Sequence, residues 1–254
     1  MRRFKILFFV ITFSTVTFSQ GTAGSGSVLE PRFIIDMPTA GILAHLNYSV
    51  DVDFYNSGGV LFGVSIGLLN TLNLGLSYGG TQLIGSSKPE WNKLPGMSLK
   101  LRPLDETEFF PAIAIGFDSQ GKEEYIDSLN RYKIKSPGIY IVLSKNFMSA
   151  GFLSFHIGSN YSLERADGDK DFNLFAGVEK TITSFISLIG EYNLAINDSN
   201  NKALGKGRGY LNLALKASVG KGFTIGINLK DIVKNQNRIS IANRTISVEF
   251  IGKI

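Results

Sequence analysis

The sequence predicts an all-β protein, a closed antiparallel up-and-down transmembrane β-barrel of about twelve strands. Three observations support this fold class. Apolar and polar residues alternate along many segments, short and long connections alternate between those segments, and no segment after the N-terminus keeps a helical period. The 254 residues are 44% apolar and 19% charged and include no cysteine, which excludes a disordered chain and a disulfide-built scaffold. Beyond the N-terminus no run of about eighteen apolar residues occurs, which also excludes a helical membrane protein.

Residues 1–19 have the features of a secretory signal peptide. Three basic residues precede an apolar run that ends at Phe18, as in the basic and hydrophobic regions of such signals. Thr17 and Ser19 are the small residues before a cleavage site at Gln20. We therefore expect export, removal of residues 1–19 and location in the outer membrane.

The mature chain divides into a lead-in and a barrel. We expect residues 20–40 to form a periplasmic N-terminal lead-in, able to plug part of the lumen, and residues 41–254 to form the outer-membrane β-barrel. The first strand, residues 44–54, alternates without an error between apolar and polar residues. Its length of about eleven residues suits a tilted strand that crosses the hydrocarbon layer, whereas strands of globular proteins usually have about five or six residues.

The same alternation recurs along the rest of the chain. The further predicted strands are 60–68, 72–78, 97–102, 111–118, 138–144, 152–161, 172–179, 186–194, 210–219, 223–230 and 245–252. The segments 97–102 and 138–144 depart most from a regular pattern. An even number of strands is typical of single-chain bacterial barrels and leaves both termini in the periplasm.

The connections distinguish a membrane barrel from a soluble β-sandwich, which also has one apolar face on every strand. The outer connections have about 5, 18, 19, 10, 15 and 13 residues and the inner ones about 3, 7, 7, 6 and 3, as in outer-membrane barrels. Aromatic residues of the apolar face lie near both ends of the strands and predict two girdles at the headgroup level. The outer girdle comprises Phe54, Tyr78, Phe117, Tyr161 and Tyr192, and the inner one Phe147, Phe223 and Phe250.

Ionisable residues occupy the polar face of the predicted strands, which points into the lumen. They form a lumen charge network of both signs: Asp51, Asp53, Lys100, Arg102, Asp118, Glu179, Glu191, Lys216, Lys230 and Glu249. Charges in a narrow interior must neutralise each other, so we expect acids and bases to pair across the lumen. This favours a filled or constricted barrel; the alternative is a polar translocation path or a sugar-binding track.

Signals for catalysis and for metal binding are weak. Ser154 and His156 share the inward face of one strand and Glu179 follows on the next, but a barrel that hydrolyses lipid needs such groups on its outward face. The stretch DGDKD at 167–171 resembles the start of a calcium loop but lacks the turn glycine and the bidentate glutamate, so we expect a solvated outer loop. We therefore expect no enzyme, no cofactor and no metal site.

A glycine-rich basic stretch, GKGRG, is the surface-loop candidate. Together with Lys202, its residues Lys206 and Arg208 suit contacts with anionic glycans or with the phosphates of lipopolysaccharide. The alternative is a flexible basic loop. The expected partners are outer-membrane lipid and lipopolysaccharide, with polysaccharide or export machinery as further candidates. Nucleic acid is not expected, because the aromatic residues lie on the wrong face to stack on bases.

Several stretches together resemble a known family. They are LEPRFIIDMPTAG at 29–41, SYGG at 77–80 followed by PEWNKLPGMSLKLRPLDE at 89–106, PAIAIGFDSQG at 111–121 and GKGRGYLN at 205–212. They resemble the YjbH-like outer-membrane barrels, which are associated with exopolysaccharide production and export in Gram-negative bacteria. The resemblance implies an outer-membrane barrel with a link to surface polysaccharide, and no catalytic residues. Well-known members of that family are much longer.

The resulting expectation is a non-enzymatic outer-membrane β-barrel protein that assists export or surface attachment of polysaccharide or another envelope molecule. The alternative is a filled structural barrel whose extracellular loops bind a surface partner. The loops concerned are 79–95, 120–137 and 195–209.

Overall fold

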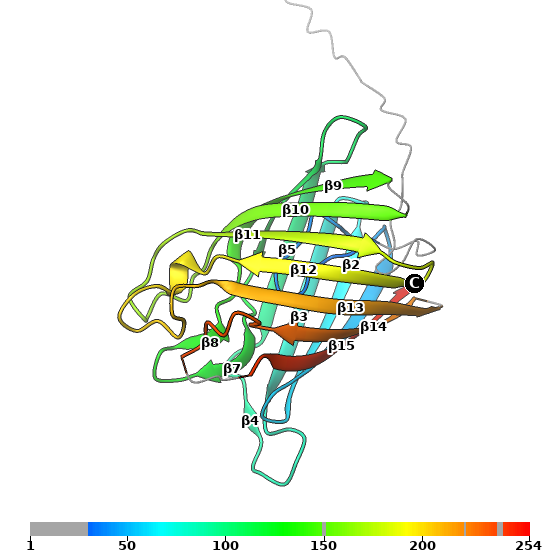
Figure 1. Cartoon of the computed structure of the whole chain (residues 1–254). Coiled ribbons are helices and arrows are strands. Elements are labelled where there is room, and N and C mark those ends of the chain that lie inside the picture. The colour runs from blue at the N-terminus through cyan, green and yellow to red at the C-terminus, as the bar shows by residue number, and fades with distance from the viewer. Residues whose placement is uncertain (1–29, 149–150, 221, 238–240) are drawn as a thin grey trace, which may run out of the picture.

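In the computed structural model, which describes residues 30–148, 151–220, 222–237 and 241–254, the chain forms a closed antiparallel barrel of 12 strands (Figure 1). The predicted signal peptide, residues 1–19, lies outside the described residues. The barrel strands are β1 (Asn47–Tyr55), β2 (Gly59–Leu68), β3 (Leu72–Thr81), β5 (Gly96–Leu104), β6 (Ala112–Asp118), β9 (Gly138–Met148), β10 (Phe152–Tyr161), β11 (Asn173–Thr181), β12 (Ile186–Asn193), β13 (Tyr210–Gly220), β14 (Phe223–Lys230) and β15 (Asn243–Lys253).

Closure follows from the pairing of the first strand with the last. β1 pairs with β2 on one side and with β15 on the other, and each barrel strand is antiparallel to both of its neighbours. Val50 lies opposite Val64 and Phe250, whereas Asp51 lies opposite Glu249. The register therefore keeps apolar residues on one face and charged residues on the other around the seam.

The outward face is the apolar one. Large hydrophobic side chains such as Leu76, Ile157 and Ile227 are exposed there, while their sequence neighbours point inward. A closed ladder satisfies the backbone N–H and C=O groups that hydrocarbon cannot. The fold is thus a transmembrane β-barrel, which confirms the predicted fold class. In the described part of the chain, no helix has the length and apolar character needed to cross a membrane.

The first strand starts later than predicted. Leu46 has a left-handed φ of 61° and its N–H donates to the carbonyl of Gly67 at 2.9 Å, so the chain turns there and β1 begins at Asn47. Residues 44–46 alternate in sequence but belong to this turn. A period of two is therefore not sufficient evidence of a strand at its end.

The long loops lie at one end of the barrel, which also carries the short turn 56–58. The long-loop end carries the short strand β4 (Glu90–Trp91), the hairpin of β7 (Lys122–Ile126) and β8 (Arg131–Ile134), and a 3-10 helix, η1 (Ile196–Asp198), as Figure 1 shows. The short-turn end carries connections such as 69–71 and 182–185. The elements of the long loops are not among the predicted strands, because β4 and β7 do not alternate and the alternation of β8 covers only four residues.

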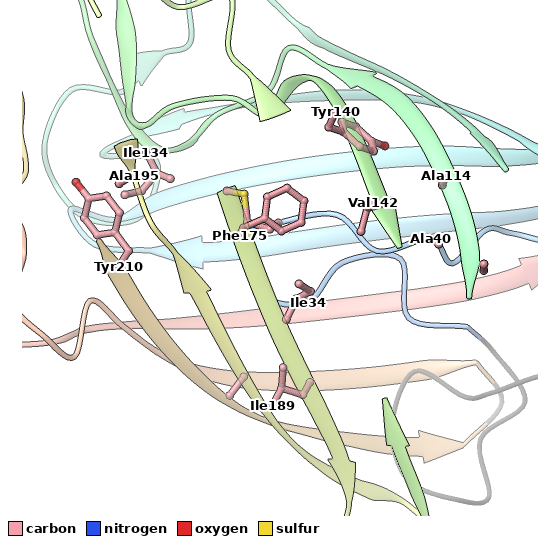
Figure 2. Close-up of a cluster of buried hydrophobic side chains, with 13 residues drawn as sticks. Ile34, Ala40, Ala114, Ile134, Tyr140, Val142, Phe175, Ile189, Ala195 and Tyr210 are labelled. Carbon is pink, nitrogen blue, oxygen red and sulfur yellow. The ribbon is translucent and has the colours of Figure 1, made fainter. Parts of the chain in front are cut away.

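Residues 30–43, which we call the internal segment, lie inside the barrel and are buried or half-buried. Of the predicted lead-in 20–40, the described part is therefore in the lumen. Ile34, Met37 and Ala40 pack into a core with inward side chains of the wall (Figure 2): Ala112, Ala114, Tyr140, Val142, Phe175, Ile189, Tyr210 and Ala214. Gly177 permits this approach, because a Cβ there would lie 2.6 Å from a methyl carbon of Ile34.

Candidate functional site

The internal segment folds into a tight turn. The N–H of Ile34 donates to the carbonyl of Met37 at 2.8 Å, and the N–H of Thr39 donates to that of Arg32 at 3.1 Å. Phe33 and Pro38 form an antiparallel bridge across the turn. These bonds satisfy only part of the segment's backbone, so the remaining polar groups need partners on the barrel wall.

Glu191 of β12 holds the tip of the turn. Its Oε2 accepts the consecutive N–H groups of Ile35, Asp36 and Met37 at 2.9, 2.8 and 2.8 Å. Its Oε1 accepts a bond from Asn212 of β13 at 2.8 Å. Successive N–H groups converging on one oxygen form a concavity that suits an anion, and here a side chain of the wall occupies it.

Ion pairs join the segment to four further strands, of which β5 contributes Arg102, the partner of Glu30. Arg32 lies 2.6 Å from Asp51 of β1 and 2.6 Å from Glu249 of β15. Asp36 lies 2.6 Å from Lys230 of β14. Because these groups are largely buried, each needs its partner to remain charged.

Two lysines of the wall donate to carbonyls of the segment. Lys100 of β5 contacts the carbonyls of Arg32 and Gly41 at 2.9 and 3.1 Å. Lys216 of β13 contacts those of Phe33 and Ile34 at 3.2 and 2.9 Å. The segment is therefore tied to both sides of the lumen.

The ten predicted lumen residues all lie on inward positions, but their ion pairs differ from those expected. Within the described chain these pairs run to the internal segment, to Lys122 of β7 and to Asp105, and not from one lumen strand to another. Arg102 pairs with Glu30, Asp118 accepts the N–H of Gln120, and the carboxylate of Glu179 faces Ser187. Opposite walls do not meet, because the internal segment lies between them.

Sequence reasoning missed five partners that complete this network: Glu30, Arg32, Asp36, Asp105 and Lys122. Arg32 and Asp36 stand as isolated charges in an otherwise apolar stretch before the first strand. That pattern is the one available signal, since a charge among buried residues needs a partner. No sequence pattern indicates Lys122 as a lumen residue, because it lies in an outer loop. Its Nζ lies 3.2 Å from a carboxylate oxygen of Asp53.

A cavity of about 110 Å³ remains on one side of the internal segment, between it and a wall formed mainly by β1, β2, β3, β14 and β15. Its charged lining residues are Arg32, Lys122, Lys216, Asp51, Asp53, Asp118 and Glu249. Phe33 also lines it, and the cations of Arg32, Lys100 and Lys122 lie 5.9, 5.4 and 5.4 Å from its ring centroid. The cavity has room for several waters and is smaller than typical ligand pockets of about 300–1,000 Å³.

His156 belongs to the weak catalytic candidate with Ser154 and Glu179, but in the structure its ring nitrogen contacts Ser144. His156 Nδ1 lies 2.8 Å from Oγ of Ser144, and that oxygen accepts the N–H of Ala40 at 2.9 Å. All three residues are buried. The pair thus anchors the internal segment. Within the described residues, no three His, Asp or Glu side chains gather as metal ligands.

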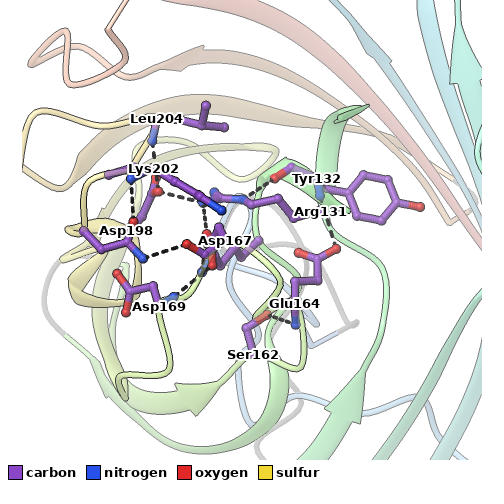
Figure 3. A network of polar contacts seen from close by, with 12 residues as sticks. Arg131, Tyr132, Ser162, Glu164, Asp167, Asp169, Asp198, Lys202 and Leu204 are labelled. Atoms are coloured by element: carbon purple, nitrogen blue, oxygen red, sulfur yellow. Dashed lines mark hydrogen bonds and ion pairs between the residues drawn. The ribbon is translucent and has the colours of Figure 1, made fainter. Parts of the chain in front are cut away.

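The long loops are joined by a buried ionic cluster around Arg131 of β8 (Figure 3). Arg131 Nη1 lies 2.8 Å from Asp167 and 2.7 Å from Asp198, and Lys135 lies 2.8 Å from Asp167. Burial would raise the pKa of Asp167, but the charges and hydrogen bonds of Lys135 and Arg131 outweigh it and hold the pKa below its ordinary value. The cluster fixes loops 119–137, 162–172 and 194–209 to one another.

The DGDKD stretch is therefore not the solvated loop that the sequence indicates. Asp167 is buried in the cluster, and Asp169 is buried and accepts the N–H of Ser199 at 2.9 Å. Glu164, earlier in the same loop, accepts the N–H groups of Tyr132 and Ser136 at 3.2 and 2.8 Å. These carboxylates serve as acceptors for neighbouring loops.

The surface-loop candidates lie at the long-loop end and are exposed. The backbone N–H groups of Lys206 and Arg208 both donate to Oδ1 of Asn235, at 2.9 and 2.8 Å. The N–H of Lys202 donates to the side chain of Asn200. The loop backbone is therefore held in place, while the three cationic side chains face solvent.

No protein-family model and no curated protein matches the chain. Among solved structures, the KdgM porin superposes with a TM-score of 0.52 and 14% identity over 80% of this chain and 98% of that chain. A KdgM porin in complex with disordered oligogalacturonate gives a TM-score of 0.50 and 12% identity, again over 80% and 98%. At this identity the likeness shows the barrel fold alone.

Proposed function

We propose that this chain is a non-enzymatic outer-membrane barrel that assists the surface attachment of polysaccharide or another envelope molecule through its outer loops. The observation that carries this proposal is the occupied lumen. Residues 30–43 occupy it, and several of its charged groups form ion pairs with that segment. A barrel with a filled lumen offers its loop surface as the place for an interaction, and the Arg131 cluster gives that surface a fixed shape.

The outer-membrane location and the link to polysaccharide rest on additional support. A closed barrel with long loops at one end and short turns at the other is typical of outer-membrane proteins. The resemblance to YjbH-like barrels adds the link to exopolysaccharide and stays a prediction. A signal peptide at residues 1–19 would provide the export that such a location requires.

Retention of polysaccharide on cells tests the proposal. Cells that lack the chain would be complemented with the parent, with Arg131→Met or with the control Lys88→Met, which removes an exposed cation from another outer loop. We expect Arg131→Met to shift polysaccharide from the cell surface to the medium with the total unchanged. Equal retention by the parent and by empty cells would contradict an attachment role.

Export through the lumen is the second candidate function. The polar cavity beside the internal segment favours it, as does the oligogalacturonate in the complex of the KdgM porin. Export would require the internal segment to leave the lumen.

Planar-bilayer conductance separates the two candidates. We expect the parent to be silent and deletion of residues 30–43 to produce stable channels, with deletion of the outer-loop residues 84–88 as the matched control. Stable conductance by the parent would favour export, as would a fall in total external polysaccharide in cells that lack the chain.

A further inference from the structure

Two tyrosines at the long-loop end of the wall each contact an arginine of the following loop. Tyr161 ends β10 and Tyr192 lies near the end of β12, both on the lipid-facing side. Arg165 donates to the hydroxyl of Tyr161 at 2.8 Å, and its guanidinium carbon lies 5.4 Å from the ring centroid. The hydroxyl of Tyr192 donates to the carbonyl of Arg208 at 2.6 Å. Both arginines are thus positioned beside the outer aromatic girdle.

The two tyrosines lie two strands apart on the barrel wall. β11 pairs with β10 on one side and with β12 on the other. Adjacent strands are about 4.8 Å apart, so Tyr161 and Tyr192 stand on strands separated by roughly 10 Å. Tyrosine rings of a girdle lie at the headgroup level of a membrane. Arg165 and Arg208 are therefore at the height of lipid headgroups.

The loop that carries Arg208 is built to lie against the wall. Gly209 has a φ of 66°, and a Cβ there would lie 2.7 Å from the carbonyl of Asn193 and 3.0 Å from the hydroxyl of Tyr192. Asn235 accepts the N–H groups on either side of Gly207. The backbone is fixed close to the girdle, while the side chains of Lys206 and Arg208 are exposed.

The cations at this edge differ from those of the neighbouring cluster in having no carboxylate partner. Arg131, Lys133 and Lys135 each form an ion pair with an acidic residue. Among the described residues no ion pair involves Arg165, Lys206 or Arg208. We call these three residues the basic edge. Its charge is available to an external anion.

We infer that the basic edge binds phosphate groups of a phosphorylated glycolipid in the outer leaflet. Arginine matches phosphate geometry with two parallel N–H donors. The edge lies beside the lipid-facing girdle, so a membrane lipid reaches it laterally, whereas a soluble polysaccharide approaches over the mouth of the barrel. The inference rests on the outer-membrane location in the proposed function and names the lipid that surrounds the barrel there.

Lipid binding by the full mature chain in non-ionic detergent tests this inference. The probes are lipid A with both phosphates, enzymatically dephosphorylated lipid A, inorganic pyrophosphate and soluble polygalacturonate. We expect the parent to bind the phosphorylated lipid at least tenfold more tightly than the dephosphorylated one. Arg165→Gln combined with Arg208→Gln should reduce that affinity at least tenfold, and Arg165→Lys with Arg208→Lys, which keeps the charge without the paired donors, should recover only part of it.

A matched control removes two exposed cations from another outer loop, Lys88→Gln with Lys93→Gln, and should bind as the parent does. The mobility of unheated samples on gels verifies that each variant is folded. Equal binding of both lipid A forms would overturn the inference, as would parent-like binding by the Arg165→Gln/Arg208→Gln variant. A loss confined to pyrophosphate or polygalacturonate would assign the basic edge to a soluble anion instead. Failure of the proposed function has different signatures, namely equal retention of polysaccharide by the parent and by empty cells, or a parent that is absent from outer-membrane fractions.

Discussion

Replacing Arg32 by methionine should release the internal segment from the seam of the barrel. The guanidinium lies 2.6 Å from Asp51 and 2.6 Å from Glu249, and the Arg32 side chain is 3% exposed. Methionine removes the charge, so two carboxylates would face each other without a cation. Breaking a buried ion pair by removing one partner costs about 3–5 kcal/mol. The Asp51 and Glu249 side chains are 30% and 18% exposed, so we expect the lower end, about 3 kcal/mol.

Urea unfolding of the mature chain in lipid vesicles measures this loss, with tryptophan fluorescence and gel mobility as signals. A destabilisation of about 3 kcal/mol reduces the ratio of folded to unfolded chains roughly 150-fold. The matched control adds Asp51→Asn and Glu249→Gln to Arg32→Met. Because neutral groups replace all three charges, the triple variant should recover most of the stability. A single variant that unfolds at the parent's urea midpoint would refute the assignment of Arg32 as an anchor.

Three further changes test other parts of the structure. Val64→Lys places a charge at mid-strand on the lipid face and should cost about 2–4 kcal/mol. Ser65→Lys faces the cavity and should cost less, and equal refolding yields in vesicles would contradict the face assignment. Burial raises the pKa of Glu164 from 4.5 to about 7, so the folded loop binds the proton more tightly and loses stability as the pH rises through that interval. Hydrogen exchange at the Tyr132 amide should show this loss in the parent and not in Glu164→Gln; the same pH response in both would exclude Glu164 as its source. Arg131→Met leaves the buried Asp198 without a cationic partner and Asp167 with Lys135 alone, so it should speed tryptic cleavage of the outer loops; parent-like rates would exclude the cluster as their anchor.

Period-two alternation predicts the barrel strands well, because hydrocarbon outside and polar groups inside impose opposite demands on successive residues. The segment 223–230 coincides with β14, and 210–219 differs from β13 by one residue. The pattern fails where a left-handed residue starts a turn, as Leu46 does before β1. It also fails in the outer loops, where hydrogen bonds between distant segments hold β7 and β8 in place.

The partners of the lumen charges could not be read from the sequence. The alternating pattern places Asp51 and Glu249 on the polar, inward face of their strands. Arg32 pairs with both, but it is 217 residues from Glu249 in the sequence. An irregular segment carries no periodicity, so its place in the lumen follows from tertiary packing alone. The same limit explains why the sequence predicts a solvated loop at Asp167, whereas this residue is buried in the structure.

Cysteine accessibility tests whether residues 30–43 occupy the lumen of the folded barrel. Because the chain has no cysteine, a single cysteine can report on each site. Met37 is 1% exposed inside the barrel and Leu94 is 70% exposed in an outer loop. We expect a water-soluble maleimide to label Met37→Cys at least about tenfold more slowly than Leu94→Cys in lipid vesicles, and equally fast after unfolding. Equal rates in the folded barrel would show that residues 30–43 do not occupy the lumen.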